Sequence, residues 1–138
     1  MITHHELCFG CGQANLFGLQ LEVEPDGDGG VAGRFFVKQD HQGPPGFAHG
    51  GIVATALDET MALLVHEEGT MALTARLEIE LRAPVPIGSF ALLRAWVAER
   101  AEQRLELRAE LRSEADPARL AARGLGTFVR LADSQNLG

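Results

Sequence analysis

Two adjacent carboxylates stand in the middle of the most apolar segment of the chain. Asp58 and Glu59 interrupt residues 45–69, where the apolar residues otherwise predict a buried helix with almost no polar face. A His-Gly-Gly sequence at residues 49–51 leaves the helix start open to close approach by a ligand. The first amides of a helix lack intrahelical acceptors, and the N-terminus carries about half a positive charge. This helix start is therefore suited to polarising a ligand oxygen, and the buried carboxylates are candidates for a functional site.

Asp58 lies too far along the helix to serve a ligand held at the start of the same helix. A rise of 1.5 Å per residue separates it from Gly51 by about 10 Å. A helix that is apolar on nearly every side also cannot be buried by a single sheet face, so we expect a curled sheet or a second subunit against it. If two such helices pack antiparallel across a two-fold axis, each Asp58 comes beside the partner's Gly50. Such a dimer would hold two composite sites.

The segments around this helix predict an antiparallel sheet. Residues 73–81 alternate between apolar and polar side chains, which predicts a strand with one dry face, and Gly69 is expected to end the helix before it. Further strands are predicted at 19–24 and 31–37, which form one hairpin, at 90–99 and 104–113, which form another, and at 118–131, with a possible bulge at Gly124 and Gly126. The result is an α+β fold in which one sheet covers one helix.

Length, charge and hydropathy limit the class of protein. The 138 residues fit a single domain spanning 1–138, with a flexible tail at 132–138. The net charge of -7 argues against a nucleic-acid partner, because binding phosphates nonspecifically needs a basic surface. The longest apolar stretch is broken by charges and is too short to span a bilayer, and the first residues do not resemble a secretion signal. We therefore expect a cytoplasmic protein with no membrane partner.

Cys8 and Cys11 are the only cysteines of the chain. Their spacing is open to four interpretations: a disulfide, a redox motif, half of a zinc site, or a structural turn. His4 and His5 could complete a set of four zinc ligands, but so local a site would be unusual. We favour a glycine-rich turn within an N-terminal segment, residues 1–18, whose sulfur side chains pack inside. No metal and no cofactor are therefore expected.

Three motifs together resemble one family. AHGGIVATALDETM, at residues 48–61, resembles the helix signature of hotdog-fold thioesterases, including the acyl-CoA thioesterases of phenylacetic acid pathways. CFGCGQANLFGLQL, at 8–21, is similar to the opening of a subgroup with a Cys-x-x-Cys-Gly segment, and LTARLEIELRAPVPIG, at 73–88, to the strand after its helix. The resemblance implies a hotdog fold, with an antiparallel sheet wrapped around one central helix, and hydrolysis of an acyl-CoA to acid and CoA.

The resemblance also implies catalytic roles. Asp58 would either attack the thioester carbonyl or act as general base on a water. The Gly50 amide would stabilise the oxyanion formed on attack, across a dimer interface. Thr74 would orient the water or the carboxylate through its hydroxyl, and His49 would shape the loop or bond the backbone.

Other residues are expected to contact the substrate. They are Gly51, Gln42, Glu59, Arg76 and Arg82. The two arginines are candidates for the nucleotide phosphates. Glu59 is the second candidate, after Asp58, for the catalytic carboxylate. It is expected to face a different neighbour from Asp58, such as an Arg. The chain departs from the family at Gly43, where many members carry Asn or Gln, and the adjacent Gln42 could substitute.

Two other functions remain open on the same scaffold. One is a hydratase or dehydratase, and the other is a protein that binds or senses acyl-CoA without turnover. A thiol or zinc module centred on the two cysteines is a third possibility. Each hotdog alternative keeps an acyl-CoA ligand and a homo-oligomer, a dimer or tetramer, as the expected partners.

Overall fold

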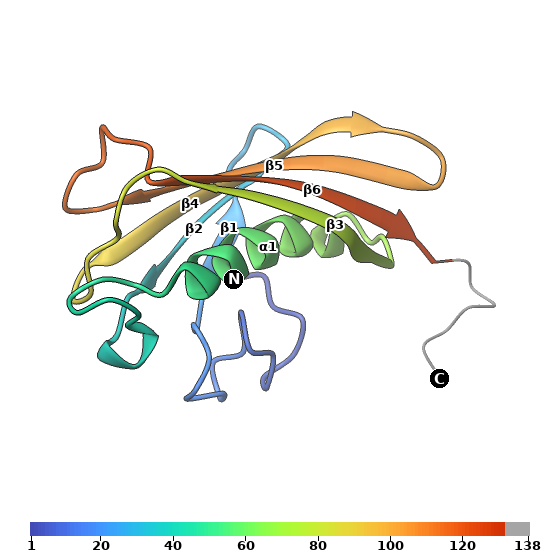
Figure 1. The fold of residues 1–138 in the computed structure, drawn as a ribbon. Coiled ribbons are helices and arrows are strands. Elements are labelled where there is room, and N and C mark those ends of the chain that lie inside the picture. Colours follow the sequence, from blue (N-terminus) through green and yellow to red (C-terminus); the bar gives the residue numbers. More distant parts are fainter. Residues whose placement is uncertain (132–138) are drawn as a thin grey trace.

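One long helix lies against one face of a six-stranded sheet (Figure 1). The computed structural model describes residues 1–131, so the predicted flexible tail at 132–138 lies outside the described residues. The strand order is β1-β2-β4-β5-β6-β3, and every neighbouring pair is antiparallel. The elements are β1 (Glu22–Pro25), β2 (Val31–Phe36), η1 (Gln39–His41), α1 (Gly50–Glu67), β3 (Ala72–Leu81), β4 (Phe90–Arg100), β5 (Arg104–Ser113) and β6 (Ala122–Arg130). This architecture confirms the expected α+β hotdog fold.

The predicted turns and hairpins also form. The pairs β1–β2 and β4–β5 are the two expected hairpins. Gly69 follows the end of α1 with φ +76, a backbone conformation that glycine adopts without a steric penalty. The last strand is shorter than predicted, because residues 118–121 precede β6 instead of belonging to it. No helix within residues 1–131 is long and apolar enough to cross a membrane.

Two glycines in β6 let α1 approach the sheet closely. A Cβ added at Gly126 would lie 2.9 Å from Phe128 Cε1 and 3.0 Å from Met61 Sδ. A Cβ at Gly124 would lie 3.5 Å from the side chains of Leu57 and Met61. Both positions keep the regular register with β3 and β5, so the predicted bulge at these glycines is wrong. Their function is to make room for the buried side of the helix.

The N-terminal segment covers the side of α1 that faces away from the sheet (Figure 1). It is tied down by backbone hydrogen bonds from Ile2 to Val23, from Leu19 to Phe9 and from Leu21 to Gly10, with N···O distances of 2.9, 2.9 and 3.0 Å. Two residues of the segment, Ile2 and Cys11, and two that follow it, Leu19 and Leu21, are buried. A segment of the same chain thus covers part of the helix. We expected a curled sheet or a second subunit in this place.

Strand β3 differs most from its sequence pattern. A bulge lies between Thr74 and Arg76, because Thr74 pairs with Phe128 and Arg76 pairs with the adjacent Thr127. The extra residue, Ala75, places Thr74 on the helix side of the sheet and Arg76 on the outer side. The predicted dry face is wrong for β3, since Leu73, Leu77 and Leu81 are all exposed in the single chain. This strand forms one edge of the sheet and pairs only with β6.

Candidate active site

The start of α1 presents one unpaired backbone amide. His49 is the N-cap residue, and its Nδ1 accepts a hydrogen bond from the Gly51 N–H at 2.9 Å. The His49 carbonyl accepts from Ile52 and Val53, and the His49 N–H donates to the His41 carbonyl at 2.8 Å. Within residues 1–131 the Gly50 N–H donates no hydrogen bond. His49 therefore bonds the backbone, as expected, and leaves the Gly50 amide for a ligand.

A mainly apolar groove of about 380 Å³ opens beside this amide. Its lining residues are Pro44, Phe47, Ala48, Gly50, Val53, Leu81, Arg82, Ala83, Pro84 and Val85. Arg82 brings the only charged side chain to the groove, and its guanidinium donates to Glu80 at 3.1 Å. The groove therefore combines apolar walls, one cation and the positive end of a helix, a combination suited to an apolar ligand with an electron-rich oxygen.

Asp58 meets Thr74 where α1 passes the edge strand. The Thr74 hydroxyl donates to Asp58 Oδ1 at 2.8 Å, and Asp58 is half-buried. Burial raises the pKa of Asp58 above its usual value, whereas the Thr74 hydrogen bond lowers it. The charge of Glu59 acts with burial, and that of His4 acts against it. The bulge at Ala75 is necessary for this contact, because strict alternation would put Thr74 on the same face as Arg76.

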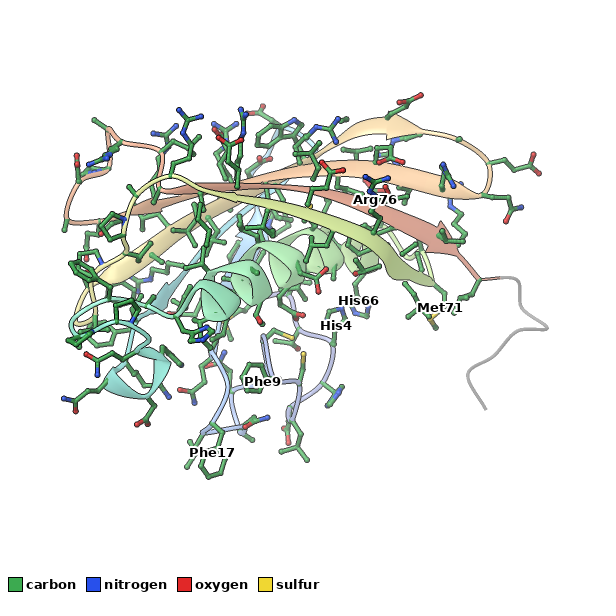
Figure 2. All side chains as sticks on the ribbon, in the orientation of Figure 1. His4, Phe9, Phe17, His66, Met71 and Arg76 are labelled. Carbon is green, nitrogen blue, oxygen red and sulfur yellow. The ribbon has the colours of Figure 1, made fainter. Side chains whose placement is uncertain are left out.

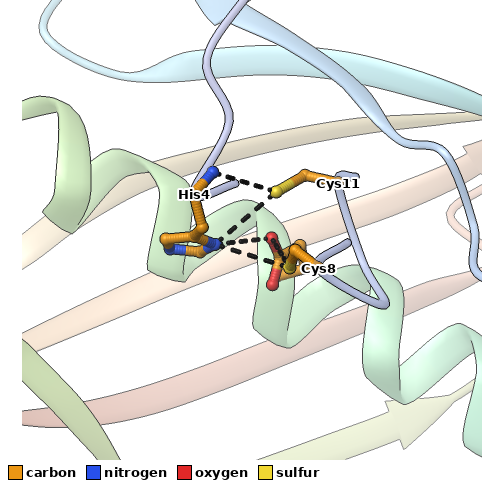
Figure 3. A group of neighbouring side chains, drawn as sticks. His4, Cys8 and Cys11 are labelled. Carbon is orange, nitrogen blue, oxygen red and sulfur yellow. Dashed lines mark hydrogen bonds and ion pairs between the residues drawn. The ribbon is translucent and has the colours of Figure 1, made fainter. Parts of the chain in front are cut away.

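Glu59 faces a different neighbour from Asp58, as expected, but this neighbour is the N-terminal segment and not an arginine. Its Oε2 lies 2.9 Å from His4 Nδ1 and 3.4 Å from Cys8 Sγ (Figure 3). Cys11 completes the group, with Sγ 3.6 Å from the same His4 nitrogen. The sequence indicates His4 and the cysteines as possible metal ligands but does not connect them with Glu59. No local spacing could do so, since 48 residues separate Cys11 from Glu59.

The two candidate phosphate-binding arginines lie apart. Arg82 lines the groove at the start of α1, whereas Arg76 points to the side of the sheet away from the helix (Figure 2). There Arg76 pairs with Glu78 at 2.7 Å and lines a separate cavity with Arg104 and Arg108. Only Arg82 can therefore contact a ligand that also reaches the Gly50 amide of the same chain.

The geometry explains the departure from the family at Gly43. A Cβ at this position would lie 2.8 Å from the Cα of His49, so no larger residue fits without moving the loop that leads to α1. The neighbouring Gln42 is exposed, and its side-chain carbonyl accepts from the Gly46 N–H at 2.6 Å. This contact holds a turn of the loop and leaves only the amide nitrogen of Gln42 available to a ligand.

The structure brings the predicted residues together in two groups. His49, Gly50 and Gly51 form one group at the helix start, and Asp58 and Thr74 form the other. The eight residue steps from Gly50 to Asp58 correspond to about 12 Å along the helix. A carbonyl that accepts a hydrogen bond from Gly50 therefore lies out of reach of Asp58 in the same chain.

Comparisons with known proteins agree on one family. Residues 45–118, more than half of the chain, match the model of the thioesterase superfamily. The acyl-coenzyme A thioesterase THEM5 of Mus musculus is 33% identical over 90 residues, which are 65% of this chain and 36% of that protein. The chain thus spans little more than a third of the length of this curated relative.

Solved structures share the fold at lower identity. A hypothetical thioesterase from Streptococcus pneumoniae, crystallised with coenzyme A, superposes with a TM-score of 0.74 at 18% identity, covering 81% of this chain and 89% of that one. The zebra fish thioesterase superfamily member 2 gives a TM-score of 0.74 at 23% identity, with 86% of both chains covered.

Proposed function

Because the chain belongs to the thioesterase superfamily, we propose that it hydrolyses acyl-CoA thioesters to a free acid and CoA, at sites that two copies of the chain complete together. The observation that carries this proposal is the Gly50 amide. It has no hydrogen-bond partner within residues 1–131 and it opens on an apolar groove. Its position at a helix N-terminus suits it to stabilise the oxyanion of an attacked thioester.

The exposed edge of β3 supports a homodimer as the working form. An edge strand has unpaired backbone groups along one side, and here Leu77 and Leu81 add exposed apolar side chains on the helix face. Pairing two such edges across a two-fold axis would bury both. It would also place two α1 helices side by side and antiparallel, with Asp58 of one near the partner's Gly50.

The acyl-CoA assignment rests on relatives and on the groove. The curated relative is named an acyl-coenzyme A thioesterase, and the structure from Streptococcus pneumoniae holds coenzyme A. The apolar walls beside Gly50 suit an acyl chain or the pantetheine arm, and Arg82 at the rim suits a phosphate.

Asp58 supplies the reactive carboxylate in this proposal. As a general base it takes a proton from water, the hydroxide attacks the thioester carbon, and the proton passes to the departing thiolate. As a nucleophile it forms a mixed anhydride and releases CoA thiolate, after which water hydrolyses the anhydride. In both routes the Thr74 hydroxyl fixes the carboxylate rotamer and the partner's Gly50 amide binds the carbonyl oxygen.

A first test measures thiol release from short, medium, long-chain and aromatic acyl-CoAs. Release from at least one class supports the proposal. Acyl-CoA binding without release from any class would replace it with the binding or sensing function. Accumulation of a hydrated or dehydrated acyl-CoA would replace it with the hydratase function.

A second test asks whether the site is composite. Gly50→Pro removes the proposed N–H donor, because proline is tolerated at the first helical position and His49 already has the extended ψ of 138 that precedes proline. Its added Cβ would lie 3.1 Å from Leu81 Cδ1, the end of a flexible side chain, so Gly50→Ala, which keeps the N–H, is the control for this added carbon. Gly50→Pro and Asp58→Asn should each lose nearly all thioester hydrolysis when assayed alone. Refolded as an equimolar mixture, they should recover about a quarter of the parent rate, because about half of the dimers are mixed and each holds one intact site. A site within one chain would recover nothing.

A further inference from the structure

Four side chains with metal-binding atoms meet on the side of α1 that faces away from the sheet (Figure 3). His4, Cys8 and Cys11 come from the N-terminal segment, and Glu59 comes from the helix. Their ligand atoms all lie within 4.8 Å of one another. Cys11 is buried and the other three are half-buried, so the group is sheltered but reachable by an ion. Both cysteines are free thiols.

Three contacts of this group converge on one ring nitrogen. His4 Nδ1 is the common neighbour of Glu59 Oε2 at 2.9 Å, Cys11 Sγ at 3.6 Å and Cys8 Sγ at 3.7 Å. A ring nitrogen carries at most one hydrogen, so it can donate to only one of these three neighbours. A cation between the four atoms would satisfy all of them at once.

Three of the distances within the group are close to the edges of a tetrahedron around such a cation. Zinc bonds of about 2.3 Å to sulfur and about 2.0–2.1 Å to nitrogen or oxygen give tetrahedral edges of about 3.5 Å from sulfur to nitrogen or oxygen and about 3.3 Å from nitrogen to oxygen. The sulfur–nitrogen distances of 3.6 and 3.7 Å and the sulfur–oxygen distance of 3.4 Å match these edges. The 2.9 Å between His4 and Glu59 is shorter than the corresponding edge and has to open to admit the ion.

The geometry points to a structural zinc site formed by His4 Nδ1, Cys8 Sγ, Cys11 Sγ and the Glu59 carboxylate. Two thiolates and an imidazole favour zinc over the harder magnesium and calcium ions, which prefer oxygen ligands. Because the protein fills all four positions, the ion has no open site for a substrate. This site replaces our expectation that the segment holds no metal, and it assigns Glu59 to the metal in place of a substrate role.

The surrounding chain is built to hold the cysteines against the helix. A Cβ at Gly10 would lie 2.4 Å from Glu59 Cγ, so only glycine lets the turn between the cysteines rest on this side chain. The His4 N–H donates to Cys11 Sγ at 3.2 Å, which supports the sulfur as a thiolate. His5, by contrast, is exposed, and its Nδ1 accepts from the Leu7 N–H at 3.2 Å, so it is no ligand.

The test uses the full chain, purified without chelators in the presence of a phosphine reductant. We expect about one zinc per chain by elemental analysis. Protein stripped with a chelator should take up one equivalent of Zn²⁺ and unfold at a higher temperature once reloaded. Co²⁺ bound in place of zinc should give the intense visible bands of a tetrahedral thiolate centre, a readout that does not depend on activity.

Variants separate a built site from chance binding. Glu59→Gln keeps the size of the side chain, and Cys8→Ser changes a half-exposed position, so both should fold. Each should weaken Zn²⁺ binding at least about tenfold, as loss of a ligand requires. His5→Asn is the matched control from the same segment and should bind as the parent does. Absence of saturable uptake by the reduced parent, or equal affinity in Cys8→Ser and the parent, would overturn the site and leave a hydrogen-bonded cluster.

Discussion

Asp58 and Glu59 are neighbours in the chain but belong to two different kinds of site. They project from α1 about 100° apart, so one faces the edge strand and the other faces the N-terminal segment. Within residues 1–131 the Asp58 side chain has one hydrogen-bond partner, Thr74, and it lies beside an unpaired strand edge. Glu59 is surrounded by three metal-binding side chains of its own chain. In the two proposals above, Asp58 therefore needs a second copy of the chain to complete its site, whereas Glu59 does not.

The sharpest way to separate the two sites is Asp58→Asn. We expect hydrolysis to fall by about two to four orders of magnitude, because the variant lacks the base or nucleophile. Its zinc content and its stabilisation by zinc should equal those of the parent, since position 58 lies outside the cluster. Thiol release and elemental analysis on the same preparation measure both. Parallel loss of zinc and activity would show that the two sites are not independent.

Gly10→Ala should damage the other site. The added methyl group would overlap Glu59 Cγ, so the turn and the helix must move apart. Overpacking of this kind costs about 1–3 kcal/mol, and zinc affinity should fall with it. Urea unfolding with and without Zn²⁺ measures both effects. Gly27→Ala is the control for loss of a glycine, because nothing lies within 4 Å of the added carbon, although its φ of +88 brings some strain. Equal zinc affinity in Gly10→Ala and the parent would contradict the close packing.

Thr74→Val tests the single contact that Asp58 makes. The change keeps the shape of the side chain but removes the donor 2.8 Å from the carboxylate. A hydrogen bond to a charged acceptor contributes about 1.5–3 kcal/mol, so we expect a loss of roughly tenfold or more in kcat/KM, less than for Asp58→Asn. Thr74→Ser keeps the hydroxyl and should retain most activity. An unchanged rate in Thr74→Val would remove Thr74 from the mechanism.

A third carboxylate, just beyond the end of α1, provides the reference for an ordinary surface contact. Glu68 accepts two hydrogen bonds of 2.7 Å from Arg100, and this contact lowers the pKa of Glu68 below its usual 4.5. Since the folded pKa lies below the unfolded one, the pair stabilises the fold above pH 4.5 and its contribution is lost as the pH falls through the folded pKa.

Glu68→Gln should therefore have the smallest effect of the four substitutions. We expect the variant to be less stable than the parent by about 1 kcal/mol or less at neutral pH, and the difference to disappear in acid. Urea unfolding over a pH series measures this, and a double-mutant cycle with Arg100→Gln isolates the pair. A difference that persists at low pH would attribute the loss to the helix end instead of the ion pair.

The fold was predictable because its signals are local. Alternation within residues 90–113 and the glycine at 69 give a hairpin and a helix end that depend only on nearby residues. The pairing of β3 with β6 and the order of the strands are long-range features that no local pattern predicts. The glycines of β6 were misread because a bulge and a close helix contact favour the same residue.

The candidate site was predictable only in part. The helix start and Asp58 follow from spacing within one element, and their predicted separation agrees with the helix that forms. The partners of Glu59 could not be found in this way, because the whole first hairpin lies between the turn at Cys8–Cys11 and α1 in the chain. Strict alternation would put Thr74 on the outer face of the sheet with Arg76. The pattern of residue types carries no signal for the inserted residue that turns Thr74 toward the helix.

Because of the bulge at Ala75, the number of residues in β3 decides whether the Thr74 hydroxyl reaches Asp58. Deleting this one residue would restore strict alternation in β3 and turn the threonine toward the outer face, with every functional side chain still encoded. A comparison of the residue types at Asp58 and Thr74 would not detect such a change. Under the proposed mechanism, a gap of one position in this strand should therefore lower activity as Thr74→Val does, although Thr74 itself is unchanged.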